Sequence, residues 1–220
     1  MKRVNKLFLI LFLFAPVLFS CNRDKESEGI SRITNYPTFV LTGGPFISVV
    51  QGGTFTDPGV KALEGSTEIP VTTTGSVDTN TPGVYEITYS AKNADNYSGT
   101  AVRTVAVIPA AENPGVDISG RYNNVGGNPA NGSDALVNTV TKLAPGFYRA
   151  SNVWGGGSLA VIPAYIFTSD GTTLQLPLSR ISPYGRVQGT GTINATGLME
   201  LSVTLLDQGL SNSPRKWQKQ

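Results

Sequence analysis

The chain has 220 residues, of which 40% are hydrophobic and 15% are charged, a size that suits one large domain or two small ones. It contains no histidine and one cysteine, which excludes Ser–His catalysis, histidine-ligated metal sites and an internal disulfide. The 25 Gly and 14 Pro residues favour short strands joined by tight turns over long helices.

The N-terminus combines a basic segment, residues 1–6, with an apolar segment, residues 7–20. The apolar run is too short for a comfortable transmembrane helix, which needs about 20 residues. The pattern is typical of the charged and apolar regions of a secretory signal. We therefore predict that residues 1–20 are a signal peptide that is removed on export.

Removal of this segment changes the charge of the protein. Without Lys2, Arg3 and Lys6, the chain has 14 basic and 15 acidic residues. Such a balance provides no electrostatic footprint for nucleic acid, which is not expected as a partner. The small basic group near the C-terminus, Arg215, Lys216 and Lys219, is predicted to be a solvated tail.

The sequence Leu18-Phe19-Ser20-Cys21 resembles the lipobox of bacterial lipoproteins, although Phe19 is bulkier than the usual residue at its position. In that family the cysteine sulfur carries a diacylglycerol and becomes the new N-terminus. The resemblance implies lipidation of Cys21 by palmitate-type acyl chains and a membrane as partner, since each buried CH₂ contributes roughly 0.8 kcal/mol. The alternative is an ordinary signal peptide beside a chance cysteine.

The segment after Cys21 is a predicted flexible tether, residues 21–34. Residues 22–28 are polar and rich in acids, which is typical of any flexible tether. They also resemble the tethers of Bacteroidota-type lipoproteins that reach the outer face of the cell. The resemblance implies an outer-membrane location facing the cell exterior, with periplasmic exposure as the alternative.

Residues 35–109 are predicted to form a first all-β module. Alternation is clearest in residues 83–91, where Tyr85, Ile87, Tyr89 and Ala91 share one face. Asp57-Pro58-Gly59 predicts a turn, and Pro109 ends the last strand. About seven short strands with frequent turns indicate an Ig-like β-sandwich.

Three ordered motifs of this module resemble bacterial surface Ig-like domains. They are Gly53-Thr54-Phe55-Thr56-Asp57-Pro58-Gly59-Val60-Lys61-Ala62, Thr81-Pro82-Gly83-Val84-Tyr85-Glu86-Ile87-Thr88-Tyr89-Ser90-Ala91 and Thr104-Val105-Ala106-Val107. Some related domains bind Ca²⁺ through clustered acids. Here Asp57, Asp78 and Asp95 each stand alone, so they are interpreted as turn residues and no metal is expected.

Residues 110–115 are predicted to be a linker, and residues 116–220 a second all-β domain. Asp170-Gly171 between apolar runs indicates a hairpin, and residues 198–206 alternate in polarity. The expected architecture is a small antiparallel β-barrel or a meander.

Parts of this second domain resemble the domain that follows an Ig-like domain in uncharacterised lipoproteins of the same bacterial group. The residues that carry the resemblance are Gly120-Arg121-Tyr122, Pro145-Gly146-Phe147-Tyr148-Arg149, Tyr184-Gly185 and Gly189-Thr190-Gly191. The layout is also similar to that of accessory lipoproteins in glycan-uptake systems. It implies polysaccharide and outer-membrane transporter components as partners, an inference from architecture alone.

No catalytic residue is predicted. A glycosidase would need two suitably placed carboxylates, and none of the acids of the second domain lies in a signature: Asp117, Asp134, Asp170, Glu200 and Asp207. Gly155-Gly156-Gly157 is followed neither by Lys-Ser/Thr nor by a helix, so it is not a phosphate-binding loop. We expect neither an enzyme nor a cofactor.

A binding role fits the sequence better, because aromatic rings can stack on sugar rings. The candidates for ligand binding are Trp154, Tyr184, Tyr165 and Trp217, with Asn152, Arg149 and Arg186 as polar neighbours. Aromatic residues of small β folds are usually core residues, which is the competing interpretation. The sequence predicts an Ig-like spacer that presents a glycan-binding β domain, with a structural or protein–protein interaction lipoprotein as the alternative.

Overall fold

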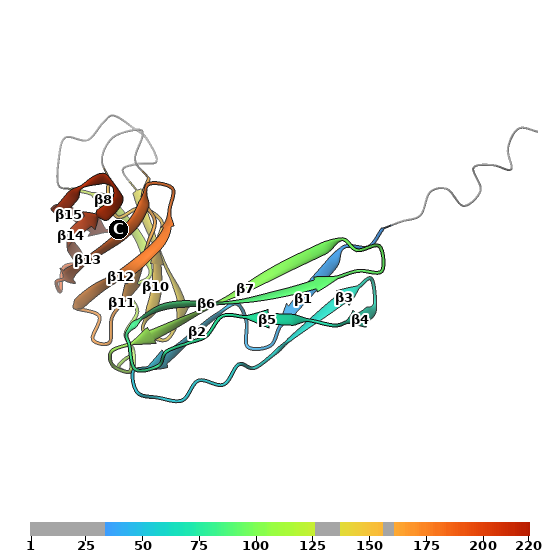
Figure 1. Ribbon diagram of the computed structural model, residues 1–220. Helices are drawn as coiled ribbons and strands as arrows, with labels where there is room; N and C mark the ends of the chain where they lie inside the picture. Colours follow the sequence, from blue (N-terminus) through green and yellow to red (C-terminus); the bar gives the residue numbers. More distant parts are fainter. Residues whose placement is uncertain (1–33, 126–136, 156–160) are drawn as a thin grey trace, which may run out of the picture. The chain divides into compact units, whose positions relative to one another are not determined.

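The computed structural model describes residues 34–125, 137–155 and 161–220 (Figure 1). The predicted signal peptide, Cys21 and almost all of the predicted tether lie outside these ranges. Residues 36–220 form one compact unit. Within the described ranges, no helix is both long and apolar enough to cross a membrane.

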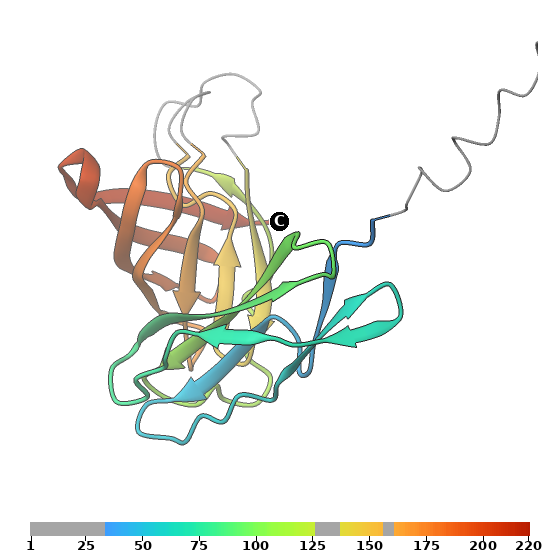
Figure 2. The same cartoon turned by 45° about the vertical axis from the view of Figure 1, so that its right-hand side comes forward.

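Residues 37–108 form two β-sheets, and the predicted Ig-like sandwich is confirmed. Figure 1 and Figure 2 show the long antiparallel β6–β7 pair. The first sheet has the order β1-β3-β4, with strands β1 (Pro37–Leu41), β3 (Val60–Glu64) and β4 (Thr67–Ile69). The second has the order β2-β7-β6-β5, with strands β2 (Phe46–Val50), β5 (Thr72–Thr74), β6 (Gly83–Lys92) and β7 (Ser98–Ile108).

The interior of the sandwich contains a buried charged group that the sequence did not reveal. Arg103 on β7 is fully buried and forms an ion pair with Asp57. Its guanidinium also donates to the carbonyl oxygens of Thr42, Gly44 and Gly59. The Tyr89 hydroxyl donates to the second Asp57 oxygen at 2.8 Å, and burial together with this bond raises the pKa of Tyr89 to about 12.

This network gives the Asp-Pro-Gly motif a second role. Asp57 does form the expected turn, since its Oδ1 accepts the backbone N–H of Gly59. It is also the counter-ion of Arg103, and a buried charge is tolerated only when it is paired and hydrogen-bonded. Asp57 is therefore part of the core rather than an isolated turn residue.

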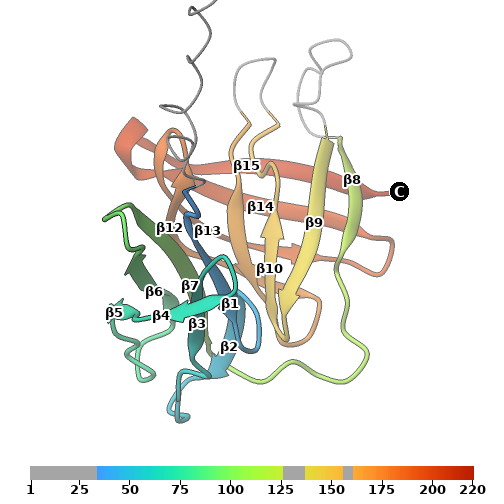
Figure 3. The ribbon, with the colours of Figure 1, turned by 90° about the vertical axis from the view of Figure 1, so that its right-hand side faces the viewer.

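The second domain is an eight-stranded closed antiparallel barrel, in agreement with the prediction. Each strand pairs with the next one in the chain, and the last strand pairs with the first. Figure 3 shows β9 between β8 and β10. The strands are β8 (Gly120–Asn124), β9 (Val137–Ala144), β10 (Phe147–Ala150), β11 (Ala164–Phe167), β12 (Thr173–Ser182), β13 (Gly185–Ile193), β14 (Leu198–Leu205) and β15 (Leu210–Lys219).

Strand β15 corrects the interpretation of Arg215, Lys216 and Lys219 as a solvated tail. These residues belong to the strand that closes the barrel between β14 and β8. Trp217 faces the interior and is fully buried, whereas Lys216 pairs with Glu200 at 2.6 Å outside. Charged residues occur at both odd and even positions of this strand, and they hid its amphipathic pattern.

The connections of the barrel fall at two ends, because antiparallel neighbours alternate in direction. The connections that follow β8, β10, β12 and β14 leave at one end, which we call the distal end. The connections that follow β9, β11 and β13 leave at the proximal end.

Residues 112–118 pack against the proximal end. Lys142 Nζ lies 2.7 Å from Glu112, the Tyr148 hydroxyl donates to the same carboxylate, and Asn113 N donates to Ser169 O at 2.8 Å. Although burial raises the pKa of Glu112, the bonds from Lys142 and Tyr148 outweigh it and hold the pKa below its usual value. The connection between the two domains is thus docked on the proximal end of the barrel.

A second apolar core joins the sandwich to one wall of the barrel. Phe147 is fully buried, with its ring centroid 4.9 Å from that of Tyr165 and 6.2 Å from that of Phe46. Ala106 and Ile108 of β7 belong to the same cluster. Because Val105 packs in the sandwich core instead, β7 is buried on both faces, as its continuous apolar sequence indicates.

Candidate functional site

The four aromatic candidates lie in different environments. Trp217 is 0% exposed in the barrel interior, and Tyr165 is 7% exposed in the core that joins the two domains. Trp154 and Tyr184 are half-buried against the barrel core. Burial of Tyr165 and Trp217 fits the competing interpretation of these two rings as core residues, and the four rings do not form one exposed platform.

Tyr165 nevertheless contributes to the wall of a groove. The groove lies where β6 of the sandwich contacts β12 of the barrel. We call it the β6–β12 groove. It is lined by Val84, Tyr85, Glu86, Tyr165, Leu178, Ser179, Arg180, Ile181 and Arg186.

The volume of the groove, about 610 Å³, falls within the range of about 300–1,000 Å³ that is typical of sites for small ligands. Side chains alternate in direction along β6, so that Val84 and Glu86 share the face of β6 opposite to that of Ile87 and Tyr89. The groove therefore combines one strand of the sandwich with one wall of the barrel.

Charged side chains of opposite sign line the two sides of the groove. Glu86 is exposed on β6, and Arg180 is exposed on β12. In the part of the chain that the structure describes, Arg180 forms no ion pair. Arg186 is different, because its Nε and Nη2 donate to Asp207 at 2.9 and 2.6 Å. These bonds lower the pKa of Asp207 to about 2 and fix the position of Arg186.

The polar and apolar groups between these charges complete the groove. Ser179 is 8% exposed, and its Oγ has no hydrogen-bond partner. Leu178 is 52% exposed beside it. A buried hydroxyl without a partner costs free energy unless a ligand or a water molecule bonds to it. The arrangement provides an acceptor at Glu86, a donor at Arg180 and a hydroxyl that can do both.

Sequence reasoning identified only part of this groove. Tyr165 and Arg186 were singled out, whereas Glu86, Ser179 and Arg180 were missed. Arg180 and Leu178 are exposed in the second half of β12, which ends at Ser182. Two register shifts between β12 and β13 interrupt the simple alternation that would have indicated this part of the strand.

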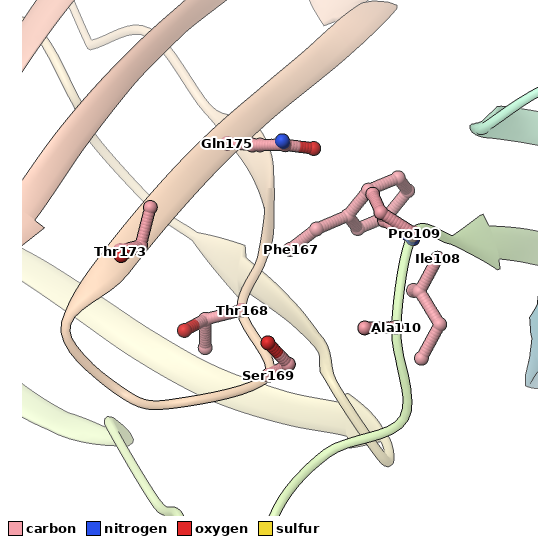
Figure 4. A pocket seen from close by; sticks show the side chains of 8 residues that line it. All are labelled: Ile108, Pro109, Ala110, Phe167, Thr168, Ser169, Thr173 and Gln175. Atoms are coloured by element: carbon pink, nitrogen blue, oxygen red, sulfur yellow. The ribbon is translucent and has the colours of Figure 1, made fainter.

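A second cavity lies between the end of β7 and the β11–β12 turn. Figure 4 shows the side chains around it, which belong to Ile108, Pro109, Ala110, Phe167, Thr168, Ser169, Thr173 and Gln175. Its volume is about 70 Å³, well below the range of roughly 300–1,000 Å³ that is typical of ligand sites. It has room for water but not for a sugar ring.

The acids considered for catalysis are occupied by local interactions. Asp170 accepts the backbone N–H groups of Thr172 and Thr173 at 2.8 and 2.7 Å, and these bonds hold its pKa well below the usual value. Asp207 binds Arg186, and Glu200 binds Lys216. Asp117 accepts from Ser119 N at 2.8 Å, and Asp134 lies outside the described residues. Among the described residues, no three His, Cys, Asp or Glu side chains gather as metal ligands would.

Comparison with protein families agrees with the Ig-like fold of the first domain. Residues 39–107 match the family described as "Bacterial surface protein, Ig-like domain". Among solved structures, the chain is similar to the lipoprotein BT2262 from Bacteroides thetaiotaomicron, with 26% identity, a TM-score of 0.42, and coverage of 84% of this chain and 100% of that chain. No curated protein matches the chain. Residues 39–107 thus match a family of Ig-like domains from bacterial surface proteins, and in this chain they are followed by a closed β-barrel.

Proposed function

We propose that this protein is held in the outer membrane by a lipid on Cys21, faces the cell exterior, and binds a glycan in the β6–β12 groove. The location is supported by the lipobox-like sequence at residues 18–21 and by the surface-protein family of residues 39–107. The acidic segment after Cys21 supports the outward orientation.

The observation that carries the glycan proposal is the mixture of groups in the groove. A sugar presents apolar C–H surfaces together with hydroxyls that both donate and accept hydrogen bonds. Leu178 and the edge of Tyr165 provide apolar surface, while Glu86, Ser179 and Arg180 provide polar groups of both kinds. The volume of about 610 Å³ is large enough for a short oligosaccharide segment.

The proposal assigns the Ig-like domain more than a spacer role. Val84 and Glu86 come from β6, so the sandwich supplies one side of the binding surface. The apolar core around Phe147 holds that side against the barrel. We therefore expect glycan binding to require both domains, and the isolated barrel to bind weakly.

Binding of the full chain to polysaccharides, measured by affinity gel electrophoresis and on a glycan array, tests the proposal. We expect Glu86→Ala and Arg180→Ala each to weaken binding about tenfold or more, since each removes a hydrogen bond that involves a charged group. Arg121→Ala is the matched control, because Arg121 is an exposed barrel residue outside the groove. Absence of retardation by every polysaccharide would contradict glycan binding and leave a protein partner as the function.

The anchor is tested separately. Cells that express the full chain are labelled with an alkyne analogue of palmitate, and we expect the label in the wild type and none in Cys21→Ser. Protease treatment of intact cells then tests the orientation, because only a protein that faces the exterior is digested. Equal labelling of both proteins would contradict lipidation at Cys21.

A further inference from the structure

A cluster of aromatic and polar residues lies at the distal end of the barrel, outside the β6–β12 groove. It contains Trp154 from the β10–β11 connection, Arg215 and Trp217 from β15, and Asn138 from β9. We call these four residues the tryptophan cluster. They are far apart in sequence, and the closure of β15 onto β8 brings them to one region of the barrel.

Direct contacts connect the members of the cluster. The Arg215 guanidinium carbon lies 3.6 Å from the centroid of the Trp154 ring. Gly155, the next residue, lies so close to the Trp217 ring that a β-carbon would approach it to 2.8 Å. Asn138 Oδ1 accepts the backbone N–H of Asn152 at 3.2 Å. The loop that begins at Asn152 therefore contacts β9 and β15 together.

Further hydrogen bonds hold this loop in place. Asn152 Oδ1 accepts from the backbone N–H groups of Trp154, Gly155 and Ile162 at 3.0, 3.1 and 3.3 Å. Asn124 Nδ2 donates to Gly155 O at 2.7 Å. Such a built arrangement resembles the preorganised support of a binding site, because the position of each ring is fixed before any ligand arrives.

Three buried N–H donors of the cluster have no hydrogen-bond partner. They are Asn138 Nδ2, Arg215 Nε and Trp217 Nε1. Asn138 and Trp217 are both 0% exposed, so bulk water does not reach them. Buried donors are nearly always paired in folded proteins, and three unpaired donors in one cluster indicate a missing acceptor.

The cluster also carries the positive charge of Arg215, and a positive charge and N–H donors both favour a negatively charged ligand. Arg215 is partly buried, which lowers the pKa of its guanidinium, and among the described residues it forms no ion pair. The ring of Trp154 compensates for part of its lost hydration. The remaining unpaired atom nearby, Asn123 Oδ1, is an acceptor, but Asn123 alternates with the inward-facing Tyr122 and therefore points outward.

We propose that the tryptophan cluster is a second binding site, which takes a small oxyanion group, a carboxylate or a sulfate. An oxyanion accepts several hydrogen bonds, and its negative charge would provide a counter-ion for Arg215. The site is separate from the β6–β12 groove, since the two share no lining residue. Its ligand would be a free anion or an acidic substituent of a sugar.

Intrinsic fluorescence measures this binding directly, because the chain has only two tryptophans and both belong to the cluster. The full chain is titrated with glucuronate, acetate, sulfate and phosphate at constant ionic strength, with chloride and glucose as controls. We expect a saturable change with at least one oxyanion and none with chloride or glucose. Preference for glucuronate over acetate indicates a sugar acid, and preference for sulfate over both indicates a sulfate group.

Variants then assign the response to the cluster. Arg215→Met should raise the dissociation constant about tenfold or more, and Trp217→Phe, which removes one donor and keeps most of the ring, should raise it several-fold. Arg215→Lys keeps the charge without Nε and covers the case in which Arg215→Met does not fold. Arg180→Met is the matched control and should bind the anion normally.

The outcome is independent of the glycan proposal. Loss of anion binding in Arg215→Met with retained binding of a neutral polysaccharide would support two sites. A response that is the same for every salt, or that is unchanged in Arg215→Met and Trp217→Phe, would overturn the oxyanion site and leave buried water as the partner of the three donors. Neither result alters the test of Glu86 and Arg180.

Discussion

The sandwich and the barrel bury polar groups in different ways. In the sandwich, the buried Arg103 is fully satisfied by Asp57 and three backbone carbonyls. In the barrel, Asn138 and Trp217 are just as deeply buried, but each has a donor without a partner. A satisfied network contributes to folding, whereas an unsatisfied one lowers stability and is expected where a ligand completes it.

The two domains also differ in how many of their carboxylates have a lowered pKa. Most carboxylates with a lowered pKa belong to the barrel or to the residues docked on it, namely Glu112, Asp117, Asp170 and Asp207. In the described part of the sandwich, hydrogen bonds from Thr81 and Asn80 lower the pKa of Asp78. The two domains should therefore differ in their response to acid as well as to mutation.

The largest expected effect comes from the core that joins the two domains. Phe147→Ala removes a fully buried ring and should lower the free energy of unfolding by about 3–5 kcal/mol. It should also separate the unfolding of the sandwich from that of the barrel, which calorimetry would show as two transitions. Val102→Ala, at a position that is 42% exposed, is the control, and a single unshifted transition in Phe147→Ala would contradict the coupling.

The ion pair of the sandwich should give the next largest effect. Asp57→Ala leaves Arg103 buried without its counter-ion, and we expect a loss of about 3 kcal/mol in urea unfolding. This value is the lower end of the usual range, because the Asp57 side chain is 28% exposed. Arg103→Met combined with Asp57→Ala should recover part of the loss, since no unpaired charge remains. If the double variant is less stable than Asp57→Ala, the account of the network is wrong.

Acid should affect the barrel before the sandwich. A carboxylate with a lowered folded-state pKa stabilises the protein above its unfolded pKa, near 4, and that contribution is lost as the pH falls through the folded value. The Asp207 value of about 2 places the loss between about pH 4 and pH 2. We expect the barrel transition to move to lower temperature over this interval, and Asp170→Asn to make the decline smaller. A melting temperature that is independent of pH in this interval would refute the expectation.

The smallest effect is expected for an ion pair at the surface of the sandwich. Lys61 Nζ lies 3.2 Å from Glu68, with the side chains 65% and 59% exposed. Lys61→Met should change the free energy of unfolding by about 1 kcal/mol or less, because water and salt screen the pair. Comparison with Asp57→Ala in the same urea titrations then measures how much burial adds to an ion pair.

The sequence was informative where local patterns determine structure. The alternation of residues 83–91 correctly located β6 and its inward face, and the Asp170-Gly171 pair correctly located a turn. The Asp57–Arg103 pair could not be foreseen, because its partners are separated by 46 positions and only the fold brings them together. Trp217 was identified as a possible ligand-binding residue from its type alone, but its depth in the barrel depends on the pairing of β15 with β8.

The pairing of β15 with β8 also has a consequence for the order of folding. β8 pairs with β9 on one side and with β15 on the other. Because β15 is the last strand of the chain, the contacts that close the barrel join residues far apart in sequence and have high contact order. A chain that emerges N-terminus first can complete the sandwich while β8 still presents an unpaired edge. During biogenesis, that unpaired edge of β8 can form hydrogen bonds with strands of other chains and so lead to aggregation. Pairing with residues 210–219 removes this risk.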